Sequence, residues 1–245
     1  MAASLKNFGV KAYSGSVKKK GTKLDWTGQM ALNSDSVFKK PSKIKQKSIF
    51  FVNSMSDFFH ANAKTEWQSK VLEEIKSLPR HQFRILTKRS ENIKGIMKKL
   101  GIRKFPDNVW IGATVEDYRV LDRIEIIKRI PAKIHFLSVE PLIEDFGKAD
   151  LNGIEWVITG GESGPGARVM KFPWLKNVLE QTMALNIPHF FKQYGKAQNN
   201  PLFWKKVKGE YVPRNNPFEY VKKNDPEGKG GSKIDGVYYK EMPSY

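Results

Sequence analysis

The sequence of 245 residues contains no cysteine. This absence excludes disulfide bonds, a thiol nucleophile, and any zinc or iron–sulfur site held by thiolates of this chain alone. Histidine is scarce as well, and the spacing of the four histidines is not that of metal ligands. We therefore predict no metal ligands in this chain. The histidines are His60, His81, His135 and His189.

Long hydrophobic runs are missing too. No run approaches the roughly 18 consecutive apolar residues that a membrane-spanning helix needs, and the N-terminus lacks the apolar region and cleavage site of a secretory signal. Hydrophobic residues nevertheless make up 40% of the chain and aromatic residues 12%, which is typical of a globular protein. We expect a cytoplasmic protein without a membrane partner, folded as one α/β domain rather than two small ones.

Acidic residues are few relative to basic ones. The formal net charge is +18, and the excess lies near the two ends of the chain: residues 1–48 carry +9 and residues 192–245 carry +5, against +4 for the long middle segment. A strongly positive field attracts polyanions, with an affinity that falls as salt rises. Nucleic acid is therefore a candidate partner, although a lysine-rich surface that serves solubility explains the charge equally well.

From residue 48 onward, apolar runs of strand length alternate with amphipathic stretches of helical length. Most of the runs are continuously apolar, which is typical of parallel strands covered on both faces. The predicted strands are 48–53, 83–88, 108–113, 133–138, 155–160 and 188–193. The predicted helices are 65–77, 90–100, 116–129 and 172–185. The alternation predicts an α/β fold with mostly parallel strands, as a full or partial TIM-like (βα) barrel; an open doubly wound sheet is the alternative.

Three segments differ in composition. Residues 1–47 are rich in lysine, and we expect a basic segment with an irregular or hairpin conformation. Residues 48–194 form the barrel-like core. Residues 195–245 contain five prolines and a glycine run, so we expect an extended, loop-rich tail that packs on or near the core. Aromatic residues of the tail are interleaved with lysines, and they either stack on bases or dock onto the core.

The carboxyl ends of the predicted strands are polar, and in parallel βα folds these ends form the working surface. Each such residue has a structural explanation when it is taken singly, for example as a helix cap or a surface ion pair. Together they predict one pocket in which Asp57, Glu140 and Glu162 are the candidate catalytic carboxylates. The candidate substrate-binding residues are Asn53, Ser56, Lys88, Arg89, Glu116, Lys192 and Gln193.

The loop GGESGPGAR after the fifth predicted strand is the sharpest local signal. Its glycines let the backbone approach a ligand, and its amides suit an anion with Arg168 as the counter-charge. It matches neither the P-loop nor the dinucleotide fingerprint, so it names no ligand, and a purely structural turn is the competing interpretation. The candidate cofactor-binding residues are Gly160, Gly161, Glu162, Ser163, Gly164 and Arg168.

Six motifs occur in the order VNSMSDFFH, ILTKR, NVWIGATVED, FLSVEPL, WVITGGESGPGAR and FFKQYG. Their order and spacing resemble the phage gp-thirty-seven/gp-sixty-eight family, whose domain is of unknown function. The resemblance covers nearly the whole chain, including DWTG near residue 25 and the ending KGGSKIDGVYYKEMP. It implies a phage protein in the cytoplasm of a bacterium or an infected host.

That family resembles radical S-adenosylmethionine enzymes, which hold an iron–sulfur cluster through three cysteines near the N-terminus. The resemblance therefore implies S-adenosylmethionine and a cluster as cofactors, with Gly160, Gly161 and Glu162 comparable to the S-adenosylmethionine-binding triplet, although they follow a late strand. The chain departs from the family here, because its first residues, MAASLKNFGVKAY, resemble the segment after the cysteines. The resemblance then implies a truncated chain without its own cluster, or one that works with a cysteine-bearing companion chain or upstream fragment.

Three functions stay open at this point, and with them the question of whether the chain is an enzyme. The first is a radical S-adenosylmethionine-like barrel protein with a substrate related to nucleic acid. The second is a nucleic-acid-binding barrel protein without catalysis. The third is a hydrolase or lyase in which two carboxylates, such as Glu140 and Glu162, act as acid and base.

Overall fold

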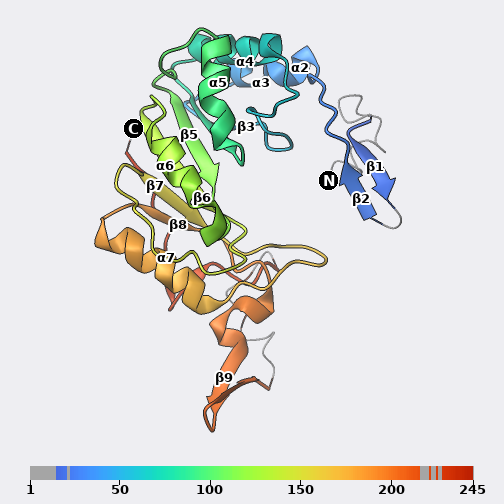
Figure 1. The fold of residues 1–245 in the computed structure, drawn as a ribbon. Helices are drawn as coiled ribbons and strands as arrows, with labels where there is room; N and C mark the ends of the chain where they lie inside the picture. Colours follow the sequence, from blue (N-terminus) through green and yellow to red (C-terminus); the bar gives the residue numbers. More distant parts are fainter. Residues whose placement is uncertain (1–14, 21–22, 216–220, 222–224, 226–227, 245) are drawn as a thin grey trace. The chain divides into compact units, whose positions relative to one another are not determined.

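The computed structural model of the chain describes residues 15–20, 23–215, 221, 225 and 228–244 (Figure 1). The chain divides into two compact units, and each is described by itself. Unit 1 comprises residues 1–111 and 130–133, and unit 2 comprises residues 112–129 and 134–245. The segment MAASLKNFGVKAY and the tail residue Phe218 lie outside the described residues.

Unit 1 contains an N-terminal hairpin, two short helices and the first βα repeats. The hairpin pairs β1 (Val17–Lys20) antiparallel with β2 (Lys23–Trp26), in the basic segment for which a hairpin was one expectation. The elements that follow are α2 (Asp35–Phe38), α3 (Lys40–Lys43), β3 (Ile49–Val52), α4 (Thr65–Ser77), β4 (Gln82–Thr87), the 3₁₀ helix η2 (Ser90–Asn92), α5 (Ile93–Lys99) and the first half of β5 (Val109–Thr114).

The helices of unit 1 form where apolar residues recur at helical spacing. In α4, Leu72 and Ile75 are buried, and in α5, Ile93 and Met97 are buried, so each helix turns one apolar face inward. β3 and β4 pair in parallel. The predicted helix 90–100 is present, but its first turn is the 3₁₀ helix η2.

Unit 2 contains the remaining βα repeats and two small hairpins. Its elements are the second half of β5, the 3₁₀ helix η3 (Tyr118–Val120), α6 (Asp122–Lys128), β6 (Ile134–Val139), β7 (Trp156–Thr159), α7 (Phe172–Ala184), β8 (His189–Phe191), the 3₁₀ helices η4 (Ala197–Asn199) and η5 (Pro201–Phe203), β9 (Trp204–Val207), β10 (Glu210–Pro213), β11 (Lys233–Ile234) and β12 (Val237–Tyr238).

Two helices of unit 2 pack on its strands: α6 contacts β6, and α7 contacts β8 (Figure 1). Pro173 lies in the first turn of α7, where its missing N–H has no helical partner to lose. The strands β6, β7 and β8 pair in parallel. Trp156 and Phe191 are buried, as expected for aromatic residues inside these strands.

The six strands from β3 to β8 form one sheet in the order of the sequence. All six predicted strands are present, each displaced by no more than a few residues, because their continuous apolar runs are long enough to mark them. A doubly wound sheet reverses its strand order at a switch point, and no reversal occurs among these strands. The chain therefore has an α/β fold with a sequentially ordered parallel sheet.

The C-terminal segment covers the edge of β8. Phe190 and Lys240 form an antiparallel bridge, and the Phe191 N–H donates to the Tyr239 carbonyl at 2.9 Å. The Trp156 indole donates to the Glu241 carbonyl at 2.9 Å. Because an uncovered edge strand invites pairing with another chain, this segment protects the sheet. Among the described residues, no helix is both long enough and apolar enough to cross a membrane.

Candidate functional site

Four loops of unit 2 meet at the carboxyl ends of β5, β6, β7 and β8, and backbone hydrogen bonds join each loop to the next. The Ile143 N–H donates to the Glu116 carbonyl at 3.3 Å, and the Leu142 N–H donates to the Gly160 carbonyl at 2.9 Å. The Gly161 N–H donates to the Gln193 carbonyl at 2.8 Å. We call this surface the unit-2 rim; it comprises residues 116–119, 140–144, 160–168 and 192–196.

Glu140 follows β6 and is bound by residues that follow β8. Its carboxylate lies 3.1 Å from the Lys192 ammonium, and the Gln193 side-chain amide donates to it at 2.8 Å. The same amide also donates to the Gly161 carbonyl at 3.1 Å. Glu140 therefore ties the loops after β6, β7 and β8 together and holds the Lys192 side chain in place.

The side chain of Glu162 binds Arg168, which lies in the same glycine loop. Its carboxylate accepts from the Arg168 backbone N–H at 2.8 Å and from two guanidinium nitrogens at 2.8 and 2.9 Å. These charge-assisted bonds, the guanidinium contacts first, lower the pKa of Glu162 to about 2. The Lys196 ammonium donates to the Ala167 carbonyl of the same loop. Glu162 is therefore an anion at neutral pH that fixes Arg168.

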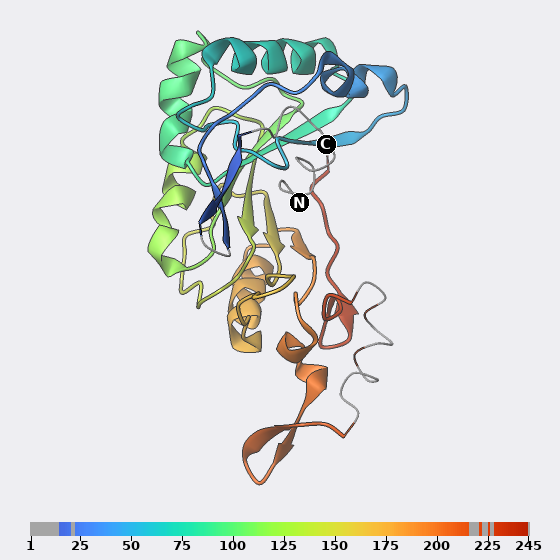
Figure 2. The same ribbon diagram turned by 90° about the vertical axis from the view of Figure 1, so that its right-hand side faces the viewer.

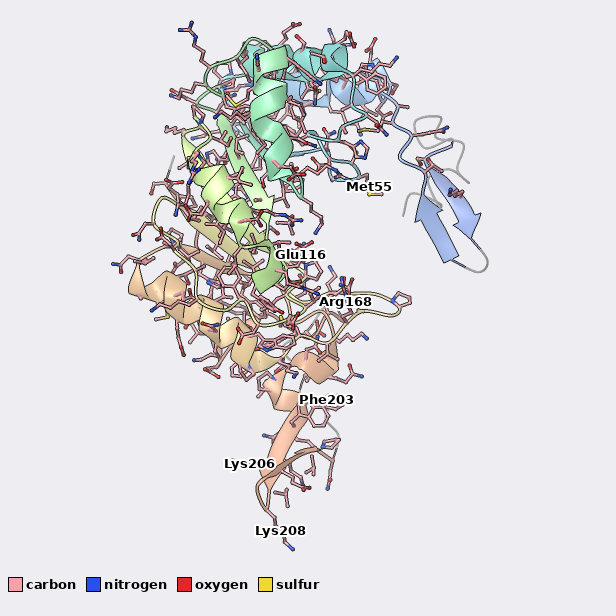
Figure 3. All side chains as sticks on the ribbon, viewed as in Figure 1. Met55, Glu116, Arg168, Phe203, Lys206 and Lys208 are labelled. Carbon is pink, nitrogen blue, oxygen red and sulfur yellow. The ribbon has the colours of Figure 1, made fainter. Side chains whose placement is uncertain are left out.

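The loop after β5 and the first turn of α6 carry two further carboxylate–arginine pairs. The Arg119 guanidinium binds Asp117 at 2.6 Å, and this contact lowers the pKa of the Asp117 carboxyl. Arg123 binds Glu116 at 2.9 Å and also donates to the Thr114 carbonyl at 2.8 Å, with both side chains of the pair largely buried. Figure 3 shows Glu116 and Arg168 on their separate loops of the rim. The negative charges of Glu116 and Asp117 act on Arg168 and help to raise its pKa, after its contact with Glu162.

In three of these pairs the cation is much more exposed than the carboxylate. Side-chain exposure is 58% for Arg119 against 6% for Asp117, and 55% for Arg168 against 30% for Glu162. It is 54% for Lys192 against 20% for Glu140. Each of these three carboxylates thus lies beneath its cation and orients it, while Glu144, 3.5 Å from the Arg119 guanidinium, is an exposed anion of the same rim.

Close backbone packing explains two glycines of the rim. A Cβ atom on Gly161 would lie 2.0 Å from the Tyr194 carbonyl oxygen, and one on Gly195 would lie 2.1 Å from the Glu162 carbonyl oxygen. No side chain fits at such distances. The loops after β7 and β8 approach each other as closely as they do because both positions are glycine.

Unit 1 has its own carboxylate cluster, around Asp57. The Asp57 carboxylate accepts from the Thr87 hydroxyl at 2.8 Å, from the backbone N–H of Phe59 at 2.9 Å and from that of Lys88 at 3.2 Å. The Arg89 guanidinium binds it at 2.9 Å. These donors join the loop after β3 to the end of β4, and we call the group the Asp57 cluster.

The remaining predicted residues of unit 1 lie near this loop. The Asn53 side-chain amide donates to the Ser56 hydroxyl at 2.9 Å, and Asn53 itself has a positive φ of 60°. Ser56 and Lys88 are exposed. The pKa of the His60 imidazole is lowered, mainly because the side chain is partly buried. The charges of Arg89 and Asp57 also act on it.

The predicted residues therefore form two groups, one in each unit. The unit-2 rim brings together Glu116, Glu140, Gly160, Gly161, Glu162, Ser163, Gly164, Arg168, Lys192 and Gln193. The Asp57 cluster and its loop contain Asn53, Ser56, Asp57, Lys88 and Arg89. The catalytic, cofactor-binding and substrate-binding roles assigned to these residues stay predictions.

Sequence reasoning left Asp117, Arg119 and Lys196 out of the site. Both Asp117 and Arg119 lie in the predicted helix 116–129, where a cap and a surface ion pair explain them structurally, and Asp117 does accept from the Arg119 N–H there. Their place in the site is indicated by an exposed cation above a buried carboxylate. Spacing in the sequence does not reveal which side chains are exposed. Lys196 lies only one residue beyond the motif FFKQYG, so the motif's position could have found it.

The residues do not fit the iron–sulfur cluster that the family resemblance implies, because such a cluster needs thiolates and the chain has no cysteine. In the part of the chain that the structure describes, no group of three or more His, Asp or Glu side chains is placed to hold a metal ion. Gly161 and Glu162 likewise have internal roles, in backbone packing and in binding Arg168. We derive no step through a cluster or through S-adenosylmethionine.

Comparison with known families gives one assignment. The model of the family "Protein of unknown function (DUF5131)" matches residues 3–243, and the chain belongs to this family. No curated protein and no solved structure matches the chain.

Proposed function

As a member of the DUF5131 family, whose function is unknown, this chain has to be interpreted from its own residues, and we propose that it binds nucleic acid through phosphate contacts at the unit-2 rim. One observation carries the proposal: Arg119, Arg168 and Lys192 each expose more than half of the side chain while a more buried carboxylate holds it. Cations fixed in this way lose little rotational freedom when they bind an anion.

Two of the three cations are arginines, whose planar guanidinium matches phosphate oxygens in a two-point contact. Asp117 and Glu162 each occupy part of their arginine, and Glu144 also lies 3.5 Å from the Arg119 guanidinium; the exposed remainder of each arginine is left for a ligand. Several cations spread over one rim suit a ligand with repeated phosphates better than one with a single carboxylate. The chain's net charge of +18 attracts the same class of ligand from a distance.

The position of the rim supports the proposal. Sequential strand order is the order of a partial TIM-like barrel, which we propose as the finer description of this sheet. In such folds, ligands bind at the carboxyl ends of the strands. Here those ends carry the exposed cations.

The alternative of a carboxylate-dependent hydrolase or lyase has less to support it. It needs one carboxyl group of the pair Glu140 and Glu162 to hold a proton near neutral pH. Arg168 lowers the pKa of Glu162 to about 2, so Glu162 does not suit the role of the acid and Glu140 alone is left for it. A radical mechanism lacks support from residues of this chain, and the proposed function needs neither chemistry.

The test is binding of a labelled single-stranded oligonucleotide to the full chain, measured by fluorescence anisotropy at several salt concentrations. The variant R119Q/R168Q/K192Q should bind at least about tenfold more weakly, since it removes three phosphate contacts. The control K94Q/K98Q/K99Q removes the same charge from exposed positions of α5 and should bind within about twofold of the wild type.

A second variant, R119K/R168K, keeps the charge and the fold while it removes the two-point contact, and it should bind with intermediate affinity. Thermal melting of every variant shows whether it is folded. Equal losses in the rim variant and the α5 control would contradict the proposal, because net charge alone would then explain the binding. Unchanged binding by a folded rim variant would contradict it as well.

A further inference from the structure

The tail of unit 2 contains a projecting basic hairpin that sequence reasoning did not predict. β9 pairs antiparallel with β10, in the register Val207↔Glu210 and Lys206↔Tyr211. In both Figure 1 and Figure 2, this hairpin extends away from α7. Figure 3 marks Phe203 at its base, Lys206 along it and Lys208 at its tip. We call it the β9–β10 hairpin.

The turn of the hairpin is tight and its base is anchored. Lys208 and Gly209 are the two turn residues, with φ values of 50° and 90°, and positive φ at both positions characterises the turns that favour two-residue hairpins. At the base, Phe203 is buried, and the Trp204 indole donates to the Gln198 carbonyl at 2.7 Å. The Arg214 N–H donates to the Phe203 carbonyl at 3.0 Å. The base of the hairpin is therefore fixed by hydrogen bonds and by the buried Phe203.

The charge of the hairpin is positive and outward. Lys206 and Lys208 are exposed and Lys205 is partly exposed, while Glu210 is the one acidic residue between Trp204 and Arg214. Lys208 lies at the tip, where a side chain enters a groove first. Val207 is exposed as well, but the lysines along β9 and at the tip make a polyanion the ligand that the chemistry of the hairpin fits best.

The hairpin also leaves the sheet beside the unit-2 rim. Residues 192–203 lead from the carboxyl end of β8 to β9, and within them Lys196 donates to the Ala167 carbonyl of the glycine loop. Asn199 donates to the Tyr194 carbonyl at 2.8 Å, which fixes the same connection. The rim, where we propose that the nucleic acid binds, and the hairpin therefore belong to the same unit.

We propose that the β9–β10 hairpin inserts into the major groove of a DNA duplex whose phosphates the unit-2 rim contacts. The inference rests on the proposed function and deepens it by naming the kind of nucleic acid. A strand of four residues spans about 13 Å, and the major groove of B-DNA, about 12 Å wide and about 8.5 Å deep, admits a two-stranded ribbon. The minor groove, about 6 Å wide, is too narrow.

The same dimensions exclude duplex RNA as the preferred ligand. The major groove of A-form RNA is deep and too narrow for protein side chains to read. The rim contacts phosphates whether the ligand has one strand or two, so the duplex-specific part of the affinity comes from the hairpin. A loss of affinity for the DNA duplex, without a loss for the single strand, therefore distinguishes the contribution of the hairpin from an effect of net charge.

The experiment compares the full-length wild type with K205Q/K206Q/K208Q, using three labelled ligands: a DNA duplex of about 20 base pairs, the RNA duplex of the same sequence, and one of the DNA strands alone. The wild type should bind the DNA duplex more tightly than the RNA duplex. The hairpin variant should lose about tenfold in affinity for the DNA duplex, and it should bind the single strand within about twofold of the wild type. K94Q/K98Q/K99Q is the charge-matched control and should behave as the wild type.

Several results would overturn the inference: equal losses in the hairpin variant and the control, unchanged duplex binding by a folded hairpin variant, or a wild type that binds the RNA duplex as tightly as the DNA duplex. The two proposals fail in different ways. If the wild type binds no nucleic acid, the proposed function itself is wrong. If single-strand binding depends on the rim but duplex binding does not depend on the hairpin, only the inference is wrong.

Discussion

The Asp57 cluster of unit 1 and the rim of unit 2 use the same residue types for different purposes. Asp57 is bound by a hydroxyl, two backbone N–H groups and the Arg89 guanidinium, so it gathers donors from its own surroundings. In the rim, Glu140 and Asp117 hold a cation that faces solvent. Arg89 is also more exposed than Asp57, 38% against 11%, but it is less exposed than the rim cations. The two regions therefore differ in how far the cation is exposed and in how many donors the carboxylate gathers.

The largest effect should come from the Asp57 cluster. Asp57→Asn leaves the Arg89 charge and several donors without their anionic partner, and we expect the free energy of unfolding to fall by roughly 3 kcal/mol. Urea unfolding of the variant measures this loss. Asp107→Asn, which removes an exposed ion pair with Lys104, should leave the free energy of unfolding nearly unchanged, because water screens that pair. If Asp57→Asn left stability unchanged but weakened nucleic-acid binding, the distinction between the two regions would be wrong.

A second loss of stability, of similar size, should appear when pH is lowered. It comes from His189, beneath the rim, rather than from the rim carboxylates. Burial lowers the pKa of His189 to about 4, and its ring nitrogens face the hydroxyls of Thr159 at 2.7 Å and Thr182 at 2.9 Å. The unfolded chain takes up this proton near pH 6.5 and the folded chain near pH 4, so stability falls as pH drops through that window, by up to about 3 kcal/mol.

Urea unfolding at pH 7 and at pH 4.5 measures this dependence. His189→Gln should flatten it, whatever the variant's stability at pH 7. An equally steep dependence in the variant would show that another group is responsible.

The packing of the rim predicts a smaller loss. Gly161→Ala places a Cβ against the Tyr194 carbonyl and should destabilise the chain by about 1–3 kcal/mol, because the loops after β7 and β8 must separate. Gly95→Ala is the matched control. Gly95 lies inside α5 with open space around it, so this substitution should stabilise the helix by roughly 0.5–1 kcal/mol. Two equal melting temperatures would contradict the close packing of the rim.

The smallest effect on stability should come from Glu162→Gln. Its bonds to the exposed Arg168 are screened by water, so we expect a loss below about 1 kcal/mol at pH 7. The stability that Glu162 contributes is present above pH 4.5, its ordinary pKa, and is lost as pH falls toward 2. Arg168 should become less well oriented, and binding of single-stranded DNA should weaken by a few fold. A large loss of stability would place Glu162 with Asp57 as a structural carboxylate.

The strands of the sheet could be predicted because their apolar runs are continuous. The hairpin of β9 and β10 could not, since its strands are only four residues long, β9 contains two lysines, and its turn uses Lys208 where Asn or Asp is the familiar signal. The rim residues could be named from the strand ends. Their partners could not: Glu140 meets Lys192 fifty-two positions away, and only the fold brings those two residues together.

The central claim is that oriented cations of the unit-2 rim, and not net charge, bind nucleic acid. The most direct measurement is the dependence of single-stranded DNA affinity on salt, plotted as log affinity against log salt for the wild type, R119Q/R168Q/K192Q and K94Q/K98Q/K99Q. Each phosphate contact on a single strand contributes about 0.7 to this slope, so the rim variant's slope should be shallower by about 2, and the control's should match the wild type. Parallel slopes for all three proteins would contradict the account.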